Sequence, residues 1–287
     1  MSYKERLIHL LDRPGGRLLL GKLATGAIRW AGGDDVEILY ANGLWTRRAG
    51  PFYFPDGQTF NYVYSDFNEW KQQMEQYMEQ CAADTEEHWL RHYSPKEGDV
   101  IIDVGAGRGE DTLTFSRGVG ASGRVIAIEA HRLSFAMLTS FCQLNRLSNV
   151  TALHLALMDK PGIVRIAECE SKWMENAVEP NGQTGPEVPA RTLEQVFRDQ
   201  GLDGVSFLKM NIEGSERYAL LGMAAVMARI AHICVACHDF RSEQGHGEQF
   251  RTRAFVERVL LDHGFRITSR VDDPRDYVRD HLFGLRP

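Results

Sequence analysis

The sequence predicts a doubly wound α/β fold, with a mainly parallel sheet between two layers of helices and an antiparallel edge strand. From Asp99 onward, short apolar runs typical of buried strands alternate with segments of helical periodicity. Strands separated by helices favour right-handed crossovers and therefore parallel pairing. The last two apolar runs, FRITSR and HLFGL, have no helical pattern of crossover length between them and predict the antiparallel edge.

The first third of the chain predicts a small N-terminal attachment that is β-rich and partly helical. Its aromatic and β-branched runs are interrupted by Asn42-Gly43 and Asp56-Gly57, pairs that favour tight hairpin turns. From Asp66 to Tyr93, apolar residues recur with the spacing of an amphipathic helix, and Ser94-Pro95 ends this pattern. We therefore expect residues 1–94 to form the attachment with a lead-in helix, and residues 95–287 to form the α/β domain.

The α/β region predicts each element in turn. The runs VIIDV, RVIAIE and VTALHLAL predict the first strands, and Pro161-Gly162 predicts a hairpin from the third run to IVRIA. The polar stretch from Glu179 to Pro189 predicts a surface loop. The later strands are SFLKMNI and HICVACH, and helices are expected at 110–119, 133–144, 192–200, 216–228 and 250–263.

Composition narrows the classes of function. The chain has 287 residues, a net charge of −6 and a pI near 5.9, which argues against a nucleic-acid partner. No run of about 18 apolar residues occurs, and charges interrupt the first twenty residues, so we expect a cytoplasmic protein without a membrane span. The five cysteines are expected to be reduced thiols. Homo-oligomerisation stays open.

A C-x-x-C-H pattern at 234–238 resembles a site of covalent haem attachment. It lies in an apolar run that predicts a strand, where alternation places the two cysteines on opposite faces. We therefore reject haem, zinc and redox functions for this pattern.

A glycine-rich turn follows the first strand of the α/β region. Gly105, Gly107 and Gly109 separate that strand from a helix and let the backbone approach a ligand closely. The dinucleotide fingerprint would need a third glycine at Glu110, where a carboxylate would face a pyrophosphate. A cationic ligand without phosphates fits better, and Asp103 is expected either to organise the loop or to accept from a bound ammonium group.

An acidic residue ends the second strand. Glu129 lies about twenty residues beyond the loop, where a carboxylate accepts hydrogen bonds from both hydroxyls of a ribose. The alternative is that Glu129 only caps the following helix. Its neighbour Ala130, Ala106 in the loop and Ala156 near the end of the third strand complete the expected cofactor-binding residues, and Ala156 is expected to border an adenine.

With these residues in place, the chain resembles the FkbM family of S-adenosylmethionine-dependent methyltransferases, over about residues 99–264. The resemblance is carried by VIIDVGAGRG, GRVIAIEAH, HLALMDKPG, VPARTLEQV, HDF and above all FLKMNIEGSERYALLGM. It implies a class I, Rossmann-like methyltransferase domain, S-adenosylmethionine as cofactor, and O-methylation of a small natural product, sugar or lipid. The sequence departs from the family where Asn211 replaces the usual aspartate.

Candidate catalytic residues follow from strand ends and from this resemblance. Removal of a proton from an alcohol acceptor is helped by a base, and His238 at the end of HICVACH is the first candidate. Glu213 and Asn211 follow the strand SFLKMNI and are expected near the acceptor. Glu213 and Asp239 would be the ligands of a divalent cation, which the sequence does not require.

Two other functions stay open. A non-catalytic protein that binds S-adenosylmethionine or another nucleoside is compatible with Asn211. A nicotinamide oxidoreductase is disfavoured by the G-x-G-x-G spacing.

Overall fold

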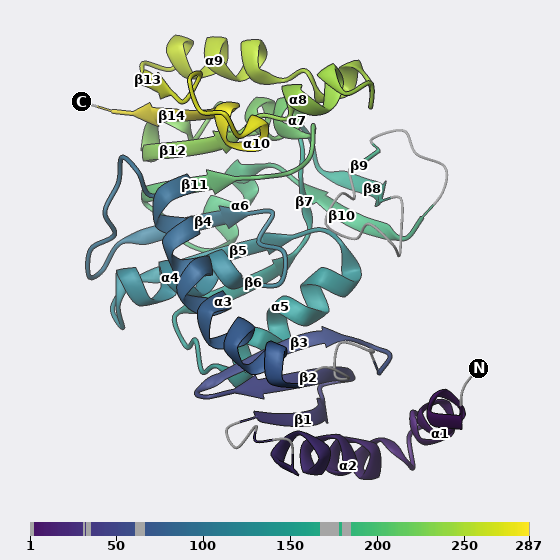
Figure 1. The fold of residues 1–287 in the computed structure, drawn as a ribbon. Helices are drawn as coiled ribbons and strands as arrows, with labels where there is room; N and C mark the ends of the chain where they lie inside the picture. Colours follow the sequence, from purple (N-terminus) through teal and green to yellow (C-terminus); the bar gives the residue numbers. More distant parts are fainter. Residues whose placement is uncertain are drawn as a thin grey trace.

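The computed structural model describes residues 3–30, 32, 36–60, 67–166, 178–179 and 185–286. Their strands form sheets of seven, four and three strands. The seven-stranded sheet is central, and the three-stranded sheet lies with the first two helices at one end of the molecule (Figure 1). The predicted α/β domain with an N-terminal β-rich attachment is therefore confirmed.

The central sheet has the strand order β13-β14-β12-β11-β4-β5-β6. Parallel pairing of β4 with both β5 and β11 makes the strand order reverse at β4. The two strands at the other end are antiparallel, β14 to β12 and β13 to β14, which confirms the predicted edge. The strands are β4 (Val100–Val104), β5 (Arg124–Glu129), β6 (Val150–His154), β11 (Val205–Met210), β12 (Ile230–Ala236), β13 (Arg266–Ser269) and β14 (His281–Leu285).

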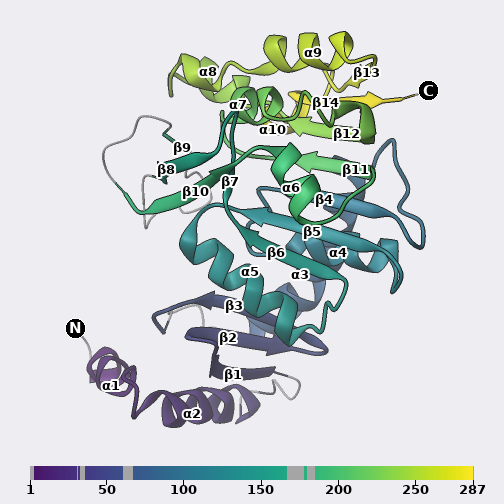
Figure 2. The same ribbon diagram turned by 180° about the vertical axis from the view of Figure 1, so that it is seen from behind.

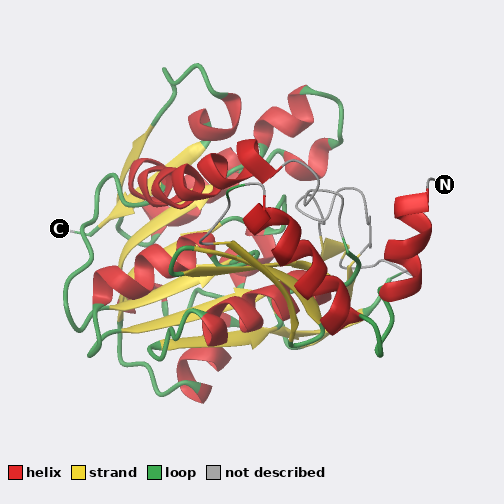
Figure 3. Cartoon of the chain, turned by 60° about the horizontal axis from the view of Figure 1, so that its bottom comes forward, coloured by secondary structure: helices red, strands yellow, loops and turns green. Residues whose placement is uncertain are grey.

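Helices cover both faces of the central sheet (Figure 3). Helices α3 and α4 lie in front of it in Figure 1, and α6 lies in front when the molecule is viewed from behind (Figure 2). The bounds are α3 (Phe67–His88), α4 (Glu110–Val119), α5 (Arg132–Leu144), α6 (Leu193–Asp199), α7 (Glu216–Leu221), α8 (Asp239–Glu243), α9 (Arg253–Asp262) and α10 (Asp276–Arg279). Two predicted helices were too long: α3 ends at His88, and α7 ends at Leu221 and is followed by turns and a short 3₁₀ helix.

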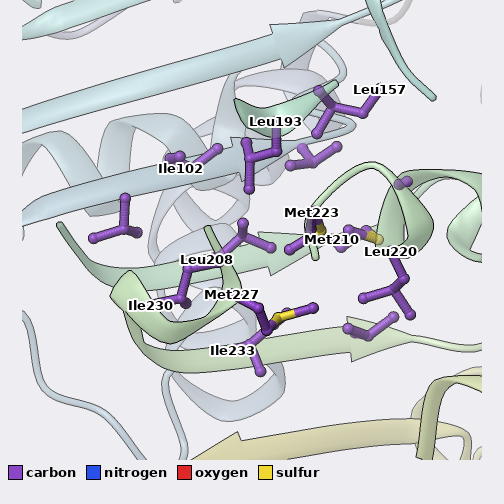
Figure 4. Packing of buried hydrophobic residues seen from close by; sticks show 14 of the residues in the cluster. Ile102, Leu157, Leu193, Leu208, Met210, Leu220, Met223, Met227, Ile230 and Ile233 are labelled. Carbon is purple, nitrogen blue, oxygen red and sulfur yellow. The ribbon is translucent and has the colours of Figure 1, made fainter. Parts of the chain in front are cut away.

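The largest core lies between the sheet and the helices α6, α7 and α9. Leu208 and Met210 of β11 point into it and meet Leu220, Met223 and Met227 (Figure 4). The opposite face of the same strand packs into a second core through Phe207. Burial on both faces accounts for the continuous apolar character of this strand.

The four-stranded sheet was not predicted correctly. It has the order β7-β10-β8-β9, with β7 (Ala156–Leu157), β8 (Gly162–Ile166), β9 (Val178–Glu179) and β10 (Glu187–Arg191). The expected hairpin between VTALHLAL and IVRIA is wrong, because β10 lies between β7 and β8 and pairs with both. The expected loop is also partly wrong, because 187–189 belong to β10 and Glu179 to β9, while 180–184 lie outside the described residues.

The N-terminal attachment consists of α1 (Tyr3–Leu11), α2 (Arg17–Trp30) and the antiparallel strands β1 (Val36–Ala41), β2 (Leu44–Ala49) and β3 (Phe52–Gly57). The turn at Asn42-Gly43 is confirmed, with φ angles of 53° and 81°. A turn at Asp56-Gly57 is wrong: the β2–β3 connection is at 50–51, and Asp56 stays in β3, where it pairs with Arg47 of β2.

The attachment packs directly onto the α/β domain. Its buried side chains, including Trp45 and Phe54, share one core with Leu113 of α4 and Phe141 of α5. The side chain of Asn145, just after α5, exchanges hydrogen bonds of 3.0 and 2.9 Å with the backbone of Tyr53. The division at residues 94/95 stays a prediction. Within the described ranges, no helix has the length and apolar character needed to cross a membrane.

Candidate functional site

A cavity of about 450 Å³ opens at the carboxyl ends of β4, β5 and β11, beside the point where the strand order reverses. Ligands bind at this position in open α/β sheets. Eight of the predicted site residues line it: Gly105, Ala106, Gly107, Glu129, Ala130, Ala156, Asn211 and Glu213. Asp103, His238 and Asp239 do not.

The glycines of the loop after β4 have different reasons to be glycine. Gly105 has φ 74°, and a Cβ there would lie 1.9 Å from the carbonyl oxygen of Asn211, so this glycine allows two strand ends to approach closely. Gly107 has φ 57°, and a Cβ there would meet nothing within 4 Å. Gly107, unlike Gly105, therefore combines a left-handed backbone with open space beside the cavity.

The carboxylate of Glu129 is held by backbone amides. The N–H of Gly107 donates to Oε2 at 2.8 Å, and the N–H of His131 donates to Oε1 at 2.7 Å. Burial raises the pKa of Glu129 to about 7, although both amides lower it. The Glu129 carboxylate is therefore a buried, oriented hydrogen-bond acceptor. Hydrogen bonds donated by a ligand would stabilise its ionised form further.

A charged network lies beneath the glycine loop. Lys209 of β11 and Asp103 of β4 are neighbours in register, and Nζ of Lys209 lies 3.0 Å from Oδ1 of Asp103. The ammonium group also donates to the carbonyl oxygen of Gly105 at 2.8 Å and lies 3.5 Å from Asp111. Burial lowers the pKa of Lys209, but Asp103 and Asp111 raise it above its usual range, which keeps the side chain protonated.

Asp103 is fully buried and accepts a hydrogen bond of 2.6 Å from the hydroxyl of Thr112 in α4. Of its two expected roles, this position favours organisation of the loop over direct contact with a bound ammonium group. The ion pair between Lys209 and Asp103 connects that loop to β11, the strand that ends directly before Asn211.

The half of the cavity beyond Glu129 is lined by small and apolar residues. Ala130, Ala156, Leu157 and Ile166 contribute to this wall. His131 begins α5 by capping it: its Nδ1 lies 3.0 Å from the hydroxyl of Ser134 and accepts from the backbone N–H of that residue. Neither His131 nor Ser134 was among the predicted site residues, although an imidazole two residues after a strand-end acid was an available indication.

The opposite half of the cavity follows β11. The side chain of Asn211 is half-buried and makes no hydrogen bond within the parts of the chain that the structure describes. Glu213 has φ 53°, a left-handed backbone that is unfavourable for a residue with a Cβ. Its carboxylate is paired with Arg241 and lies 3.3 Å from Nε2 of His238.

His238 sits behind this wall between two carboxylates. Its Nδ1 lies 2.9 Å from Oε1 of Glu216, and its Nε2 faces Glu213. Burial lowers the pKa of His238, but Glu216 and Glu213 overcome this and raise it to about 10. A protonated imidazole that is held on both sides is poorly suited to act as a general base near neutral pH.

Asp239 caps a helix outside the cavity. Its Oδ2 accepts hydrogen bonds of 2.9 Å from the backbone N–H groups of Thr252 and Arg253, where it caps the start of α9. Among the residues that the structure describes, no three His, Cys, Asp or Glu side chains form a group that could hold a metal ion.

Helix α3 forms one wall of the cavity, which was not predicted from the sequence. Cys81, Asp84, His88 and Trp89, from the end of this helix and the residue after it, all line it. The ring of Trp89 lies 5.1 Å from Nζ of Lys209, within the range of a cation–π interaction.

Comparison with known families identifies this architecture. Residues 103–267, more than half of the chain, match the methyltransferase FkbM domain, so the chain belongs to the FkbM methyltransferase family. The identification made from the sequence motifs is therefore confirmed. No curated protein matches the chain.

Solved structures provide distant relatives. The chain is similar to an FkbM methyltransferase from Methylobacillus flagellatus KT, with 14% identity, 79% of this chain and 63% of that chain covered, and a TM-score of 0.45. It is similar to fibrillarin from Aeropyrum pernix with natively bound S-adenosyl-L-methionine, with 15% identity, coverage of 70% and 72%, and a TM-score of 0.43. A SAM-dependent methyltransferase from Aquifex aeolicus gives 17% identity, coverage of 73% and 95%, and a TM-score of 0.42.

Proposed function

We propose that the protein transfers a methyl group from S-adenosylmethionine to a hydroxyl group of a small molecule such as a natural product, a sugar or a lipid. The observation that carries this proposal is the carboxylate of Glu129, buried at the end of β5 and oriented by two backbone amides at the cavity. Its position suits the two hydroxyls of a ribose. Family membership supplies the reaction class.

The residues around the cavity fit S-adenosylmethionine. Glu129 would accept from the ribose, and the small wall formed by Ala130 and Ala156 would border the adenine. Gly107, with open space beside its Cα, would face the amino-acid end of the cofactor. When bound, the cofactor supplies a methyl group that its sulfonium already makes electrophilic.

The protein's own contribution is proposed to be alignment of the acceptor. Asn211 has a side-chain amide at the cavity that can both donate and accept a hydrogen bond, and it would orient a hydroxyl group. Glu213, beside it, has its pKa held down by His238 and Arg241 against the effect of burial, so it stays ionised. An ionised carboxylate accepts a hydrogen bond from a hydroxyl, which orients the oxygen lone pair, and alignment can supply much of the acceleration.

His238 is proposed as a positioning residue for Glu213. The sequence suggested it as the base, but it lies outside the cavity lining, and two carboxylates stabilise its charged form. The imidazolium ring fixes the Glu213 carboxylate, together with Arg241. This arrangement explains how a strained residue at φ 53° keeps one orientation.

A non-catalytic role in binding the cofactor is the second candidate. It is favoured by Asn211, which cannot ionise, and by the fixed charges around Glu213. The two functions differ in turnover, because an enzyme releases S-adenosylhomocysteine when a suitable acceptor is present and a binding protein does not.

Calorimetry tests the nucleoside site directly. We expect S-adenosylhomocysteine to bind the protein and NAD not to bind. Glu129→Ala should weaken the binding of S-adenosylhomocysteine by about 10- to 100-fold, because hydrogen bonds to a charged group contribute a free energy of this size. Glu194→Ala is the matched control, because Glu194 is exposed on α6 and is not among the residues that line the cavity.

Absence of binding by the wild-type protein, or equal binding by both variants, would contradict the proposal. Release of S-adenosylhomocysteine during incubation with hydroxylated acceptors then separates catalysis from binding alone.

A further inference from the structure

The first two helices expose an unusual amount of apolar surface. In α2, Leu20, Gly21, Thr25 and Ile28 face the three-stranded sheet and are buried. On the outward face, Leu19 is 52%, Leu23 51% and Trp30 93% exposed. At about 100° per residue, these three side chains fall within a narrow arc of the helix.

Helix α1 has an outward stripe of the same kind. Tyr3 is 85%, Leu7 43% and Leu10 59% exposed, and their spacing of four and three residues places them on one face. Both helices lie at the outer end of the molecule, with no other element of Figure 1 beyond them. We call the side chains of Tyr3, Leu7, Leu10, Leu19, Leu23 and Trp30 the N-terminal apolar face.

The segment that carries this face is positively charged. Residues 1–30 contain six Lys or Arg against two acidic residues, a net charge of +4 in a chain whose total is −6. Lys22 and Arg29 are exposed on α2 beside the leucines, and neither forms an ion pair with the described part of the chain. Arg6 and Arg13 are also exposed.

We propose that the N-terminal apolar face binds the surface of an anionic lipid membrane. A helix with leucine and tryptophan on one side and Lys or Arg beside them lies in the plane of the lipid headgroups, with its apolar side chains inserted. Tryptophan favours this interface, because its ring is apolar and its N–H is polar. The local charge of +4 matches anionic headgroups, whereas the rest of the chain, at −10, is repelled by them.

Vesicle sedimentation provides the test. The intact protein is expected to bind vesicles of equal parts phosphatidylglycerol and phosphatidylcholine, to bind pure phosphatidylcholine much less, and to lose binding as salt rises. The double variant Leu19→Ser/Leu23→Ser should weaken binding by about tenfold or more, since it removes two inserted side chains. The charge-reversed variant Lys22→Glu/Arg29→Glu should abolish the preference for phosphatidylglycerol.

A matched control changes two leucines of similar exposure elsewhere. Leu221 is 55% and Leu261 54% exposed, and Leu221→Ser/Leu261→Ser should bind vesicles as the wild type does. Because Trp30 is 93% exposed, its insertion should also shift the fluorescence of the wild type to the blue, and Trp30→Phe should lose that shift.

Several results would overturn the proposal. One is a wild type that does not sediment with anionic vesicles at low salt, and another is equal loss of binding in both leucine double variants. A third is a dimer in light scattering that Leu19→Ser/Leu23→Ser converts to a monomer without any vesicle binding, which would mean that a second copy of the chain covers this face. None of these measurements depends on methyl transfer.

Discussion

The carboxylates in the two halves of the cavity are stabilised in different ways. At the end of β5, Glu129 is held by two backbone amides and, among the described residues, forms no ion pair with a cation. After β11, Glu213 is paired with Arg241 and His238, and His238 is paired in turn with Glu216. The carboxylate of Glu129 is therefore available to a neutral diol. In the other half, the charged side chains pair with one another, and Asn211 is a neutral polar group at the cavity. The comparison suggests recognition on one side and rigid positioning on the other.

The largest effect is expected where the charges are paired. His238→Gln removes the cation between Glu213 and Glu216, and breaking a buried ion pair costs about 3 to 5 kcal/mol of unfolding free energy. The folded-state pKa of His238, about 10, lies above the usual 6.5, so its stabilisation is complete below pH 6.5 and disappears as the pH rises through 10. Urea unfolding at pH 6, 8 and 10 should therefore show a difference between wild type and variant that shrinks with pH.

The control for this variant is His232→Gln on β12, the strand that ends two residues before His238. His232 is half-buried, and its Nδ1 lies 3.1 Å from the backbone carbonyl oxygen of Ser206. Within the described part of the chain, it forms no ion pair with a carboxylate. Its replacement should cost less than about 1 kcal/mol. A His238→Gln difference that is equally small, or that increases with pH, would show that the imidazole is not held as a cation.

A smaller, pH-dependent effect is expected at Glu129. Its folded-state pKa of about 7 lies above the ordinary 4.5, so ionisation of this buried group weakens the folded state as the pH rises from 4.5 to 7. Glu129→Gln lacks this titration. The wild type should lose about 1 to 3 kcal/mol of unfolding free energy relative to the variant between pH 5 and pH 8.

Saturating S-adenosylhomocysteine sharpens the Glu129 experiment. If ribose hydroxyls donate to the carboxylate, its pKa falls and the pH dependence flattens in the bound wild type. The exposed Glu194→Gln should behave as the wild type throughout. If the unfolding free energies of the wild type and Glu129→Gln depend on pH in the same way, the raised pKa of the buried Glu129 carboxylate is contradicted.

The two halves also differ in how far the sequence predicted them. The glycine loop and Glu129 belong to one continuous strand, turn, helix and strand, where local spacing determines which groups meet. Their place at the cavity was predicted. The clamp on His238 joins Glu216 of α7 to the end of β12, and that contact depends on how two separate segments pack.

Non-local packing also accounts for the other differences. The strand β10 enters between β7 and β8 from a segment whose proline and glycines predicted a loop. His88 and Trp89 reach the cavity only because α3 lies along the sheet, and amphipathic spacing cannot specify which neighbour a helix will meet. The pairing of Lys209 with Asp103 depends on strand register, which the sequence alone left open.

The smallest effect on stability is expected at Asn211, in the half of the cavity that follows β11. Because its side chain is half-buried and forms no hydrogen bond within the described residues, Asn211→Ala should change the unfolding free energy by less than about 1 kcal/mol. Its proposed work is orientation of the acceptor, so methyl transfer should fall by about tenfold or more, while S-adenosylhomocysteine binds as in the wild type. The matched variant Asn145→Ala removes a side-chain amide that hydrogen-bonds to the backbone of Tyr53, and neither residue lines the cavity. This variant should lower the unfolding free energy without changing the rate of methyl transfer per folded molecule. Equal rates for Asn211→Ala and the wild type would assign acceptor positioning to Glu213 alone, whereas loss of cofactor affinity would place Asn211 in the recognition half.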